Sequence, residues 1–202
     1  MEKEILIASG NKGKIKEIRE ILAGFPYVLT SLSDYWNPVP HIPEEGATFY
    51  ENAAGKAQWV FSRTGKMALA DDSGLEVDFL AGEPGVKSAR FAGEPSSDRK
   101  NVAKLLSLLS SCPDEKRCAK FRCVIVLKIN EKEEIVAQGA CKGRIGYEPQ
   151  GTSGFGYDPV FYPDGFDATF AQLDATTKNR ISHRGKAIID LKEKLHGRLI
   201  IK

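Results

Sequence analysis

The 202-residue sequence lacks the features that mark several specialised classes of protein. Its four cysteines form no Cys-x-x-Cys pair and no histidine lies at zinc-finger spacing, which disfavours a structural zinc site. The N-terminus runs directly into a strand-like segment, with no long apolar stretch for a signal peptide or a membrane span. We therefore expect a cytoplasmic protein with reduced thiols and without a membrane partner.

Net charge is also small, at +2, although 28% of the residues are charged. No whole-protein field favours nucleic acid, so affinity for phosphate has to come from local clusters. The glycine spacing and the Lys-Ser/Thr ending of a Walker A loop are absent, which disfavours a P-loop NTPase. The length fits a single domain over residues 1–202, with room for two lobes.

An unusual pair of carboxylates follows a short apolar run. Residues 67–70 predict a buried strand that stops at Asp71, Asp72, Ser73 and Gly74. Hard oxygen ligands at a strand end indicate a magnesium site, with one aspartate free to act as a base. An ordinary turn is the alternative, because Asp, Ser and Gly are the common turn residues.

A second segment of interest is the turn from Gly10 to Lys14, between a buried strand at residues 4–9 and an amphipathic helix. Strand, glycine-containing loop and helix together offer backbone N–H groups and a positive dipole end to a phosphate. Lys14 adds a full charge. A plain strand-to-helix turn is the alternative interpretation.

A capping box predicts the start of the next helix, with Thr48 at the N-cap and Glu51 three residues later. Asn52 and Lys56 lie four residues apart and so share one face of this helix. Taken alone, Lys56 is interpreted as a solvated lysine. Further on, Asp98 is expected to cap a helix.

Further strands are predicted at residues 27–31, 75–79, 121–129 and 134–147. The strand at 121–129 has apolar residues on both faces, including Cys123, which suits a central strand covered on both sides.

The stretch 151–159 contains three glycines that allow a close backbone approach. Phe155 and Tyr157 would supply a flat stacking surface, and Asp158 can accept a hydrogen bond from a base. A bland flexible loop is the alternative, but it would leave both aromatic rings exposed without a purpose.

Cations gather before and within the first turn of the last helix. Lys178 precedes Ser182, which can cap this helix, and His183 and Arg184 follow the cap. Bare cations are unfavourable beside the positive dipole end, so an anion or an electron-rich ligand nearby would explain them. A solvated basic face is the alternative for each residue alone. Together, the acidic pair, the phosphate turn and the aromatic loop suggest a nucleoside triphosphate and metal-assisted attack of water.

Six motifs, in order, resemble the inosine/xanthosine triphosphate pyrophosphatases, which remove deaminated purine nucleotides. They are Ser9-Gly10-Asn11-Lys12-Gly13-Lys14, Glu44-x-Gly46-x-Thr48-Phe49-x-Glu51-Asn52-Ala53, Ala70-Asp71-Asp72-Ser73-Gly74-Leu75, Pro84-Gly85-x-x-Ser88-Ala89-Arg90, Gly154-Phe155-Gly156-Tyr157-Asp158-Pro159 and Ile181-Ser182-His183-Arg184-Gly185. The resemblance implies an α/β fold that is elongated and two-lobed, built around a long, mixed, twisted sheet flanked by helices. It places the active site in the cleft between the lobes and implies a homodimer.

The resemblance also implies roles for individual residues. Asp72 matches the catalytic proton acceptor and a Mg²⁺ ligand, with Asp71 and Glu44 as the other metal-associated carboxylates; Glu45 is the alternative to Glu44. The implied substrate-binding positions are Ser9, Gly10, Asn11, Lys12, Gly13, Lys14, Lys56, Ser73, Phe155, Gly156, Tyr157, Asp158, Lys178, His183 and Arg184. Of these, Lys12 contributes only its backbone. Ser153 departs from the pattern, since a glycine is frequent at that position.

The implied reaction splits ITP, dITP or XTP between the α- and β-phosphates, giving the monophosphate and pyrophosphate. Two alternatives from other classes are a catalytically silent nucleotide sensor and a nucleic-acid-binding protein that stacks bases on the Phe155 and Tyr157 loop. The small net charge and the acidic pair argue against nucleic acid.

Overall fold

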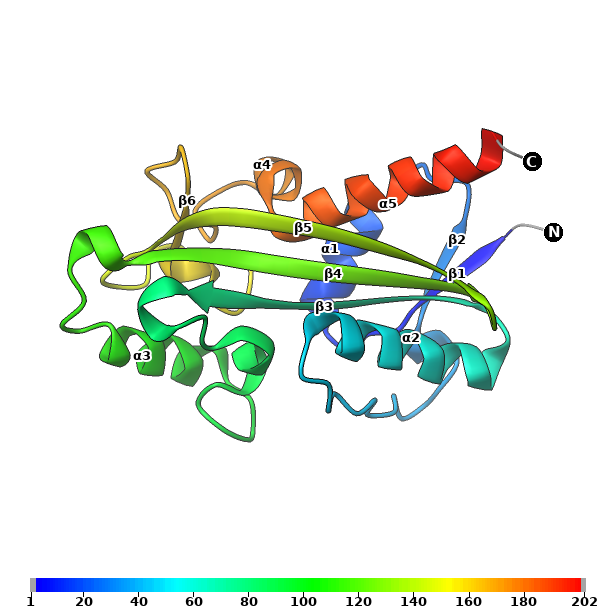
Figure 1. The fold of residues 1–202 in the computed structure, drawn as a ribbon, viewed down its shortest axis with the longest axis horizontal. Coiled ribbons are helices and arrows are strands. Elements are labelled where there is room, and N and C mark those ends of the chain that lie inside the picture. The colour runs from blue at the N-terminus through cyan, green and yellow to red at the C-terminus, as the bar shows by residue number, and fades with distance from the viewer. Residues whose placement is uncertain (1–2, 201–202) are drawn as a thin grey trace. The chain divides into compact units, whose positions relative to one another are not determined.

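The computed structural model describes residues 3–200 of the chain (Figure 1). Its strands form a mixed sheet in the order β2-β1-β3-β4-β5-β6. They are β1 (Glu4–Ile7), β2 (Val28–Ser31), β3 (Met67–Val77), β4 (Cys118–Asn130), β5 (Glu133–Ile145) and β6 (Phe161–Pro163). β1 pairs in parallel with β2 and β3, whereas β5 and β6 are antiparallel. The predicted α/β class with a mixed sheet flanked by helices is confirmed.

The helices are α1 (Lys12–Ile21), α2 (Phe49–Thr64), α3 (Asp98–Leu108), α4 (Ala175–Ile181) and α5 (His183–Ile200). None of the helices within residues 3–200 is both long enough and apolar enough to cross a bilayer.

Two compact units make up the chain. The first comprises Met1–Asp72, Cys123–Gly139 and Arg184–Lys202, and the second comprises Ser73–Arg122 and Ala140–His183.

In the first unit the sheet is covered on both faces, because side chains alternate along each strand. Ile5, Ile7 and Leu69 pack with apolar residues of α1 and α5, whereas Leu6 and Ala68 pack with α2. In Figure 1, α5 lies on one side of the strands and α2 on the other. β4 contributes to both clusters, which confirms the predicted central strand.

The second unit has its own core, which is rich in aromatic rings. Phe121, Phe161 and Phe170 contact one another with ring centroids 4.7–5.9 Å apart. Leu105 of α3 and Tyr157 are buried in the same cluster. The glycine-rich loop is thereby attached to a packed interior.

The capping box predicted at the start of α2 is confirmed. The Glu51 amide donates to Thr48 Oγ1 at 3.1 Å, and the Thr48 amide donates to Glu51 Oε2 at 3.1 Å. The helix ends at Thr64 and is capped by Gly65, whose φ of 64° is the left-handed conformation that favours glycine.

The prediction that a strand stops at Asp71 is wrong. β3 continues through Asp71, Asp72 and Gly74 to Val77, so the carboxylates lie in mid-strand and are buried. Local residue preference favoured a turn, but Lys14 and Arg184 pair with Asp71 and Lys56 pairs with Asp72, so both carboxylates are accommodated inside the strand.

Smaller boundary errors have similar causes. α1 begins at Lys12, so the predicted phosphate turn includes the first helical turn. Ser97 rather than Asp98 caps α3, through a bond from the Lys100 amide to Ser97 Oγ. β6 and α4 were not predicted, because both are too short to show a periodic pattern.

Glu4 at the start of β1 supplies a test of acid stability. Its carboxylate accepts hydrogen bonds from Lys66, Tyr35 and Thr30, and Lys66, then Tyr35, lower its pKa from 4.5 to about 2. The folded pKa is below the ordinary one, so this contribution to the free energy of unfolding is present above pH 4.5. It is lost as the pH falls toward 2.

We expect Glu4→Gln to lower the urea midpoint at neutral pH, with the difference from wild type shrinking as the pH falls through this window. Urea denaturation of both proteins across a pH series measures it. The exposed Glu83→Gln is the control. A deficit that is equally large in acid would contradict the assignment.

Candidate active site

The alternation of β3 separates the two adjacent carboxylates. Asp71 shares the face of Leu69, toward α1 and α5, and Asp72 shares the face of Ala70, toward α2. Each carboxylate therefore meets a different set of partners.

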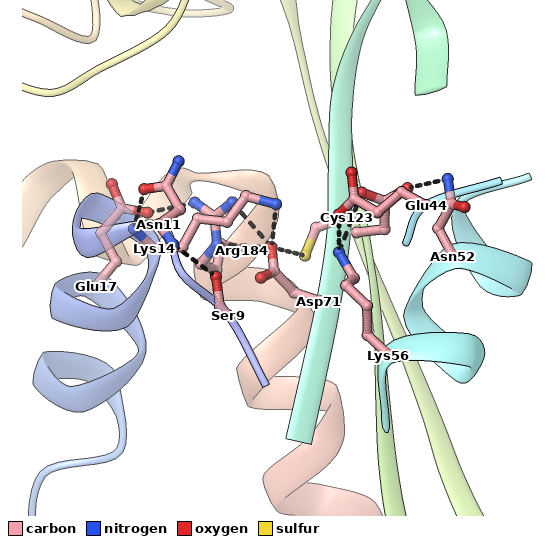
Figure 2. Close-up of polar contacts among 11 residues, drawn as sticks. Ser9, Asn11, Lys14, Glu17, Glu44, Asn52, Lys56, Asp71, Cys123 and Arg184 are labelled. Carbon is pink, nitrogen blue, oxygen red and sulfur yellow. Dashed lines mark hydrogen bonds and ion pairs between the residues drawn. The ribbon is translucent and has the colours of Figure 1, made fainter. Parts of the chain in front are cut away.

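On the first face, Asp71 binds two cations. Its Oδ2 lies 3.1 Å from Lys14 Nζ and 3.1 Å from Arg184 Nη2 (Figure 2). Arg184 also pairs with Glu17 of α1, and its side chain is only 1% exposed. Two carboxylates and two cations thus form a buried, electrically balanced cluster within the first unit.

Charge decides the protonation state of Asp71. Burial alone would raise its pKa, but the charges of Lys14 and Arg184 outweigh burial and hold the pKa well below its usual range. Cys123 of β4 lies on the same carboxylate, with its Sγ 4.0 Å from Asp71 Oδ2. Burial, followed by the Asp71 charge, raises the pKa of this thiol to about 12, so it stays protonated.

On the second face, Asp72 contacts the polar side of α2. Asn52 Nδ2 donates to Asp72 Oδ2 at 3.0 Å, and Lys56 Nζ lies 3.6 Å from Asp72 Oδ1. Lys56 Nζ is also 2.5 Å from Glu44 Oε1 (Figure 2). One ammonium group thus lies between two carboxylates, and the interpretation of Lys56 as a solvated lysine is wrong.

Asp72 differs from Asp71 in its proton affinity. Burial raises the pKa of Asp72 above its ordinary value, although Lys56, Lys14 and Asn52 each act to lower it. A carboxylate with a raised pKa is better suited to accepting a proton than an ordinary aspartate.

The approach of the Glu44 segment to α2 depends on Gly46. Its amide donates to Asn52 Oδ1 at 2.8 Å, which leaves Asn52 Nδ2 directed at Asp72. A Cβ at position 46 would lie 2.7 Å from Glu51 Cβ and 2.8 Å from Asn52 Oδ1. Glu45, in contrast to Glu44, is exposed.

The turn before α1 is organised by its own side chains. Asn11 caps the helix by accepting from the Lys14 amide at 3.1 Å, and Ser9 Oγ accepts from the Asn11 amide at 3.2 Å. Lys12, Gly13 and Lys14 form the first helical turn, where backbone N–H groups lack helical acceptors. Gly10 and Lys12 are exposed, so the turn presents a positive helix end to solvent.

In the second unit, Asp158 and Lys178 form a buried ion pair with Lys178 Nζ 2.6 Å from Asp158 Oδ2. The same oxygen accepts from the Phe155 amide at 2.9 Å. Gly154 has a φ of 80°, and a Cβ there would lie 2.1 Å from Asp158 Oδ2. The Phe155 ring is half-buried, with its centroid 5.1 Å from Lys178 Nζ.

Phe155 and Tyr157 were both expected to supply a stacking surface, but the two rings differ in exposure. Only 3% of Tyr157 is exposed, and its ring packs in the core, so the loop presents Phe155 as its accessible ring. His183 is buried against Phe121 of β4, with ring centroids 4.7 Å apart and an interplanar angle of 11°. Ser73 is half-buried in β3, and Gly156 is half-buried in the loop.

The structure thus brings the predicted residues together in two sets. The first unit holds the α1 turn, Glu44, Lys56, both aspartates and Arg184, and the second holds Ser73, the loop, Lys178 and His183. The expected position of the active site between two lobes stays a prediction. So does the contact of Arg184 with a base, since its guanidinium is bound to Asp71 and Glu17.

Sequence reasoning gave no role in the site to three polar residues that organise these sets: Asn52, Glu17 and Asp98, the last of which was expected only to cap a helix. Asn52 had been placed correctly beside Lys56, and Glu17 could have been noticed because it lies three residues after Lys14 on one helix face. Asp98 carries no such signal, since its partner, the Gly156 amide, is 58 residues away in the sequence.

Known proteins resemble this chain over nearly its whole length. The model of the Ham1 family matches residues 5–194. The chain belongs to the Ham1 family. A dITP/XTP pyrophosphatase of Shouchella clausii is 48% identical over 194 residues, which cover 96% of this chain and 97% of the relative. A dITP/XTP pyrophosphatase of Geobacter sulfurreducens is 49% identical, covering 95% and 96% of the two chains.

Solved structures agree with this assignment. The structure of a HAM1 protein from Coxiella burnetii matches with a TM-score of 0.87 and 41% identity, covering 96% of this chain and 99% of the other. The Staphylococcus aureus Ham1 protein matches with a TM-score of 0.85 and 44% identity, covering 97% and 100%.

The cluster around Asp71 predicts a large stability effect. Asp71→Asn would leave Lys14 and Arg184 facing a neutral amide, and breaking a buried charge pair costs about 3–5 kcal/mol. We expect urea denaturation to show a loss of this size in the free energy of unfolding. Glu20→Gln is the control, because it removes only the exposed ion pair with Lys16 on α1. It should change the free energy of unfolding by less than about 1 kcal/mol. Equal effects of the two variants would contradict a buried, balanced cluster.

Proposed function

We propose that this protein hydrolyses the non-standard purine nucleoside triphosphates ITP, dITP and XTP to the monophosphate and pyrophosphate. Membership of the Ham1 family and the names of its relatives support this activity. The observation that carries the proposal is the arrangement of Asp72, Lys56 and Glu44: a buried carboxylate of raised pKa next to a cation and a second carboxylate.

The phosphates are assigned to the first unit. The N-terminus of α1 supplies backbone donors and a positive dipole end, and Lys14 and Lys56 supply two full charges. Both lysines are held by carboxylates, so their ammonium groups are positioned before a substrate arrives. Ser9 and Asn11 shape the turn through their hydrogen bonds.

The carboxylates also fit a Mg²⁺ ion. Glu44 and Asp72 already share one cation, the Lys56 ammonium group, and their oxygens are the hard ligands that Mg²⁺ prefers. No group of three His, Cys, Asp or Glu side chains within residues 3–200 converges as a complete metal site. That is consistent with an ion bound by one or two carboxylates together with substrate phosphates.

When bound to Glu44 and Asp72, Mg²⁺ would neutralise phosphate charge and polarise the scissile phosphoanhydride. Asp71 was expected as a third metal-associated carboxylate. Its contacts with Lys14 and Arg184 support a different role, in which it holds the phosphate-side lysine.

Asp72 is assigned as the general base. It would orient a water molecule and accept its proton as the water oxygen attacks the α-phosphorus. The bond from this phosphorus to the oxygen that bridges the α- and β-phosphates breaks, and pyrophosphate leaves with the electron pair. Asn52 fixes Asp72 Oδ2 by its 3.0 Å hydrogen bond, and the water is assigned to Asp72 Oδ1, which lies 3.6 Å from Lys56 Nζ. Lys14, Lys56 and the end of α1 stabilise the charge of the leaving group.

The purine is assigned to the second unit. A 6-keto purine presents an acceptor at C6 and a donor at N1, and the neighbouring Lys178 and Asp158 offer the complementary donor and acceptor. Adenine's amino group would leave these buried partners unpaired, which is a strong basis for rejection. Phe155 supplies a stacking ring, and Ser73, Gly156 and His183 of the same unit are further expected contacts.

We also propose a homodimer, as the resemblance found in the sequence predicts, and a cytoplasmic location. Light scattering of the purified protein at micromolar concentration tests the homodimer prediction.

A substrate panel tests the activity directly. Purified protein with saturating Mg²⁺ is expected to release pyrophosphate from ITP, dITP and XTP much faster than from ATP, because adenine leaves Asp158 and Lys178 mismatched. Release of orthophosphate instead would indicate a γ-phosphatase. Tight nucleotide binding without any release would indicate a nucleotide sensor. Salt-dependent binding of single-stranded nucleic acid that ITP does not compete away would support the nucleic-acid alternative instead.

Asp72→Asn tests the catalytic assignment. The amide keeps the shape of the side chain but accepts no proton, so turnover should fall by at least about a hundredfold while nucleotide binding stays measurable. Pyrophosphate release and equilibrium binding of ITP are the two measurements. The exposed Asp164→Asn is the matched control and should turn over like wild type. Wild-type turnover in Asp72→Asn would remove Asp72 from the role of base.

A further inference from the structure

Two hydrogen bonds tether the loop at residues 154–158 to elements outside it. The Gly156 amide donates to Asp98 Oδ2 at 2.7 Å, and the Tyr157 hydroxyl donates to the Ser88 carbonyl oxygen at 2.8 Å. Both bonds lie within the second unit, and each spans more than fifty residues of sequence. Adjacent residues of the loop are therefore fixed to two different elements.

The Ser88 tether leads into rigid structure. Ser88 is buried, its Oγ accepts from the Leu75 amide of β3 at 2.9 Å, and it donates to the Gly85 carbonyl oxygen at 2.6 Å. The Tyr157 ring packs in the same core as Leu75. This network gives a function to the Pro84-Gly85-x-x-Ser88-Ala89-Arg90 motif, which had none in the proposed reaction.

The Asp98 tether begins at the first residue of α3. Because Ser97 caps this helix, the Asp98 carboxylate is available to the Gly156 amide. Gly156 has a φ of 61° and lies two residues after Gly154, which also has a positive φ. Glycines adopt many backbone conformations at similar free energy, so a loop that contains them needs outside contacts to hold one of them.

We infer that Asp98 and the Tyr157 hydroxyl are positioning residues for purine recognition. This inference rests on the proposed function. The resemblance places Tyr157 among the substrate-binding positions, but its hydroxyl is bonded to the Ser88 carbonyl oxygen, and the proposed function gives neither this hydroxyl nor Asp98 a contact with the base. They fix residues 156 and 157, and residues 155 and 158 on either side carry the stacking ring and the recognition carboxylate. Holding the loop in its binding conformation removes an ordering cost from substrate association.

The expected signature is a change in KM without a matching change in kcat, because the groups that activate water lie in the first unit. Tyr157→Phe keeps the buried ring but removes the hydroxyl. We expect it to raise KM for dITP by about tenfold, since a buried acceptor is left unsatisfied. Asp98→Ala should raise KM by about threefold, because its bond is exposed to solvent. Asp98→Asn keeps an acceptor oxygen and should recover most of the loss.

Tyr147→Phe is the matched control. It removes a tyrosine hydroxyl that bonds to Asp114 elsewhere in the same unit, and it should leave KM for dITP unchanged. If Tyr157→Phe and Asp98→Ala lower the melting temperature but keep the wild-type KM, the tethers are merely structural and the inference is wrong.

Hydrogen–deuterium exchange separates this inference from the proposed function, since it needs no turnover. Amides in a peptide covering residues 151–158 should exchange faster in Tyr157→Phe and Asp98→Ala than in wild type, and at the wild-type rate in Tyr147→Phe. Unchanged exchange in the first two variants would overturn the positioning role. Absence of pyrophosphate release by the wild-type protein would instead overturn the proposed function.

Discussion

The alternation of side chains along β3 is the constraint on which the candidate catalytic chemistry depends. Adjacent carboxylates on one face would repel each other, and one would tend to hold a proton. In mid-strand, Asp71 and Asp72 face opposite sides of the sheet, so each acquires its own cations. Burial of both aspartates inside a strand is therefore compatible with a stable fold, and the two can differ in protonation behaviour.

That separation divides the work between the two residues. Asp71, neutralised by Lys14 and Arg184, stays ionised and ties α1 and α5 to β3. Asp72 has a weaker set of partners and a raised pKa, as a base requires. Each aspartate also holds a lysine, Lys14 for Asp71 and Lys56 for Asp72. The carboxylate that pairs with each lysine fixes its position. In the proposed reaction this preorganisation reduces the rearrangement needed when phosphates arrive.

Local patterns predicted the parts of this structure that local forces determine. The capping box of α2, the two apolar faces of β4 and the shared face of Asn52 and Lys56 depend on residues a few positions apart. The continuity of β3 through Asp71 and the burial of Tyr157 do not depend on such local neighbours. Both depend on partners more than fifty residues away, and a single sequence carries no sign of which segments will meet.

The motif glycines show how such long-range contacts still leave a trace in the sequence. The glycines at 151–159, Gly154 among them, were expected to allow a close backbone approach, whereas Gly46 was given no purpose. Gly46 and Gly154 each lie where a Cβ would collide with a polar side chain, Asn52 or Asp158. In both places a backbone amide reaches that side chain: the Gly46 amide bonds to Asn52, and the Phe155 amide bonds to Asp158. The missing side chain thus permits a hydrogen bond that orients a functional group. Gly46 and Gly154 are therefore positions of close packing. Gly46 lies beside the residues assigned to the base, and Gly154 lies beside those assigned to purine recognition.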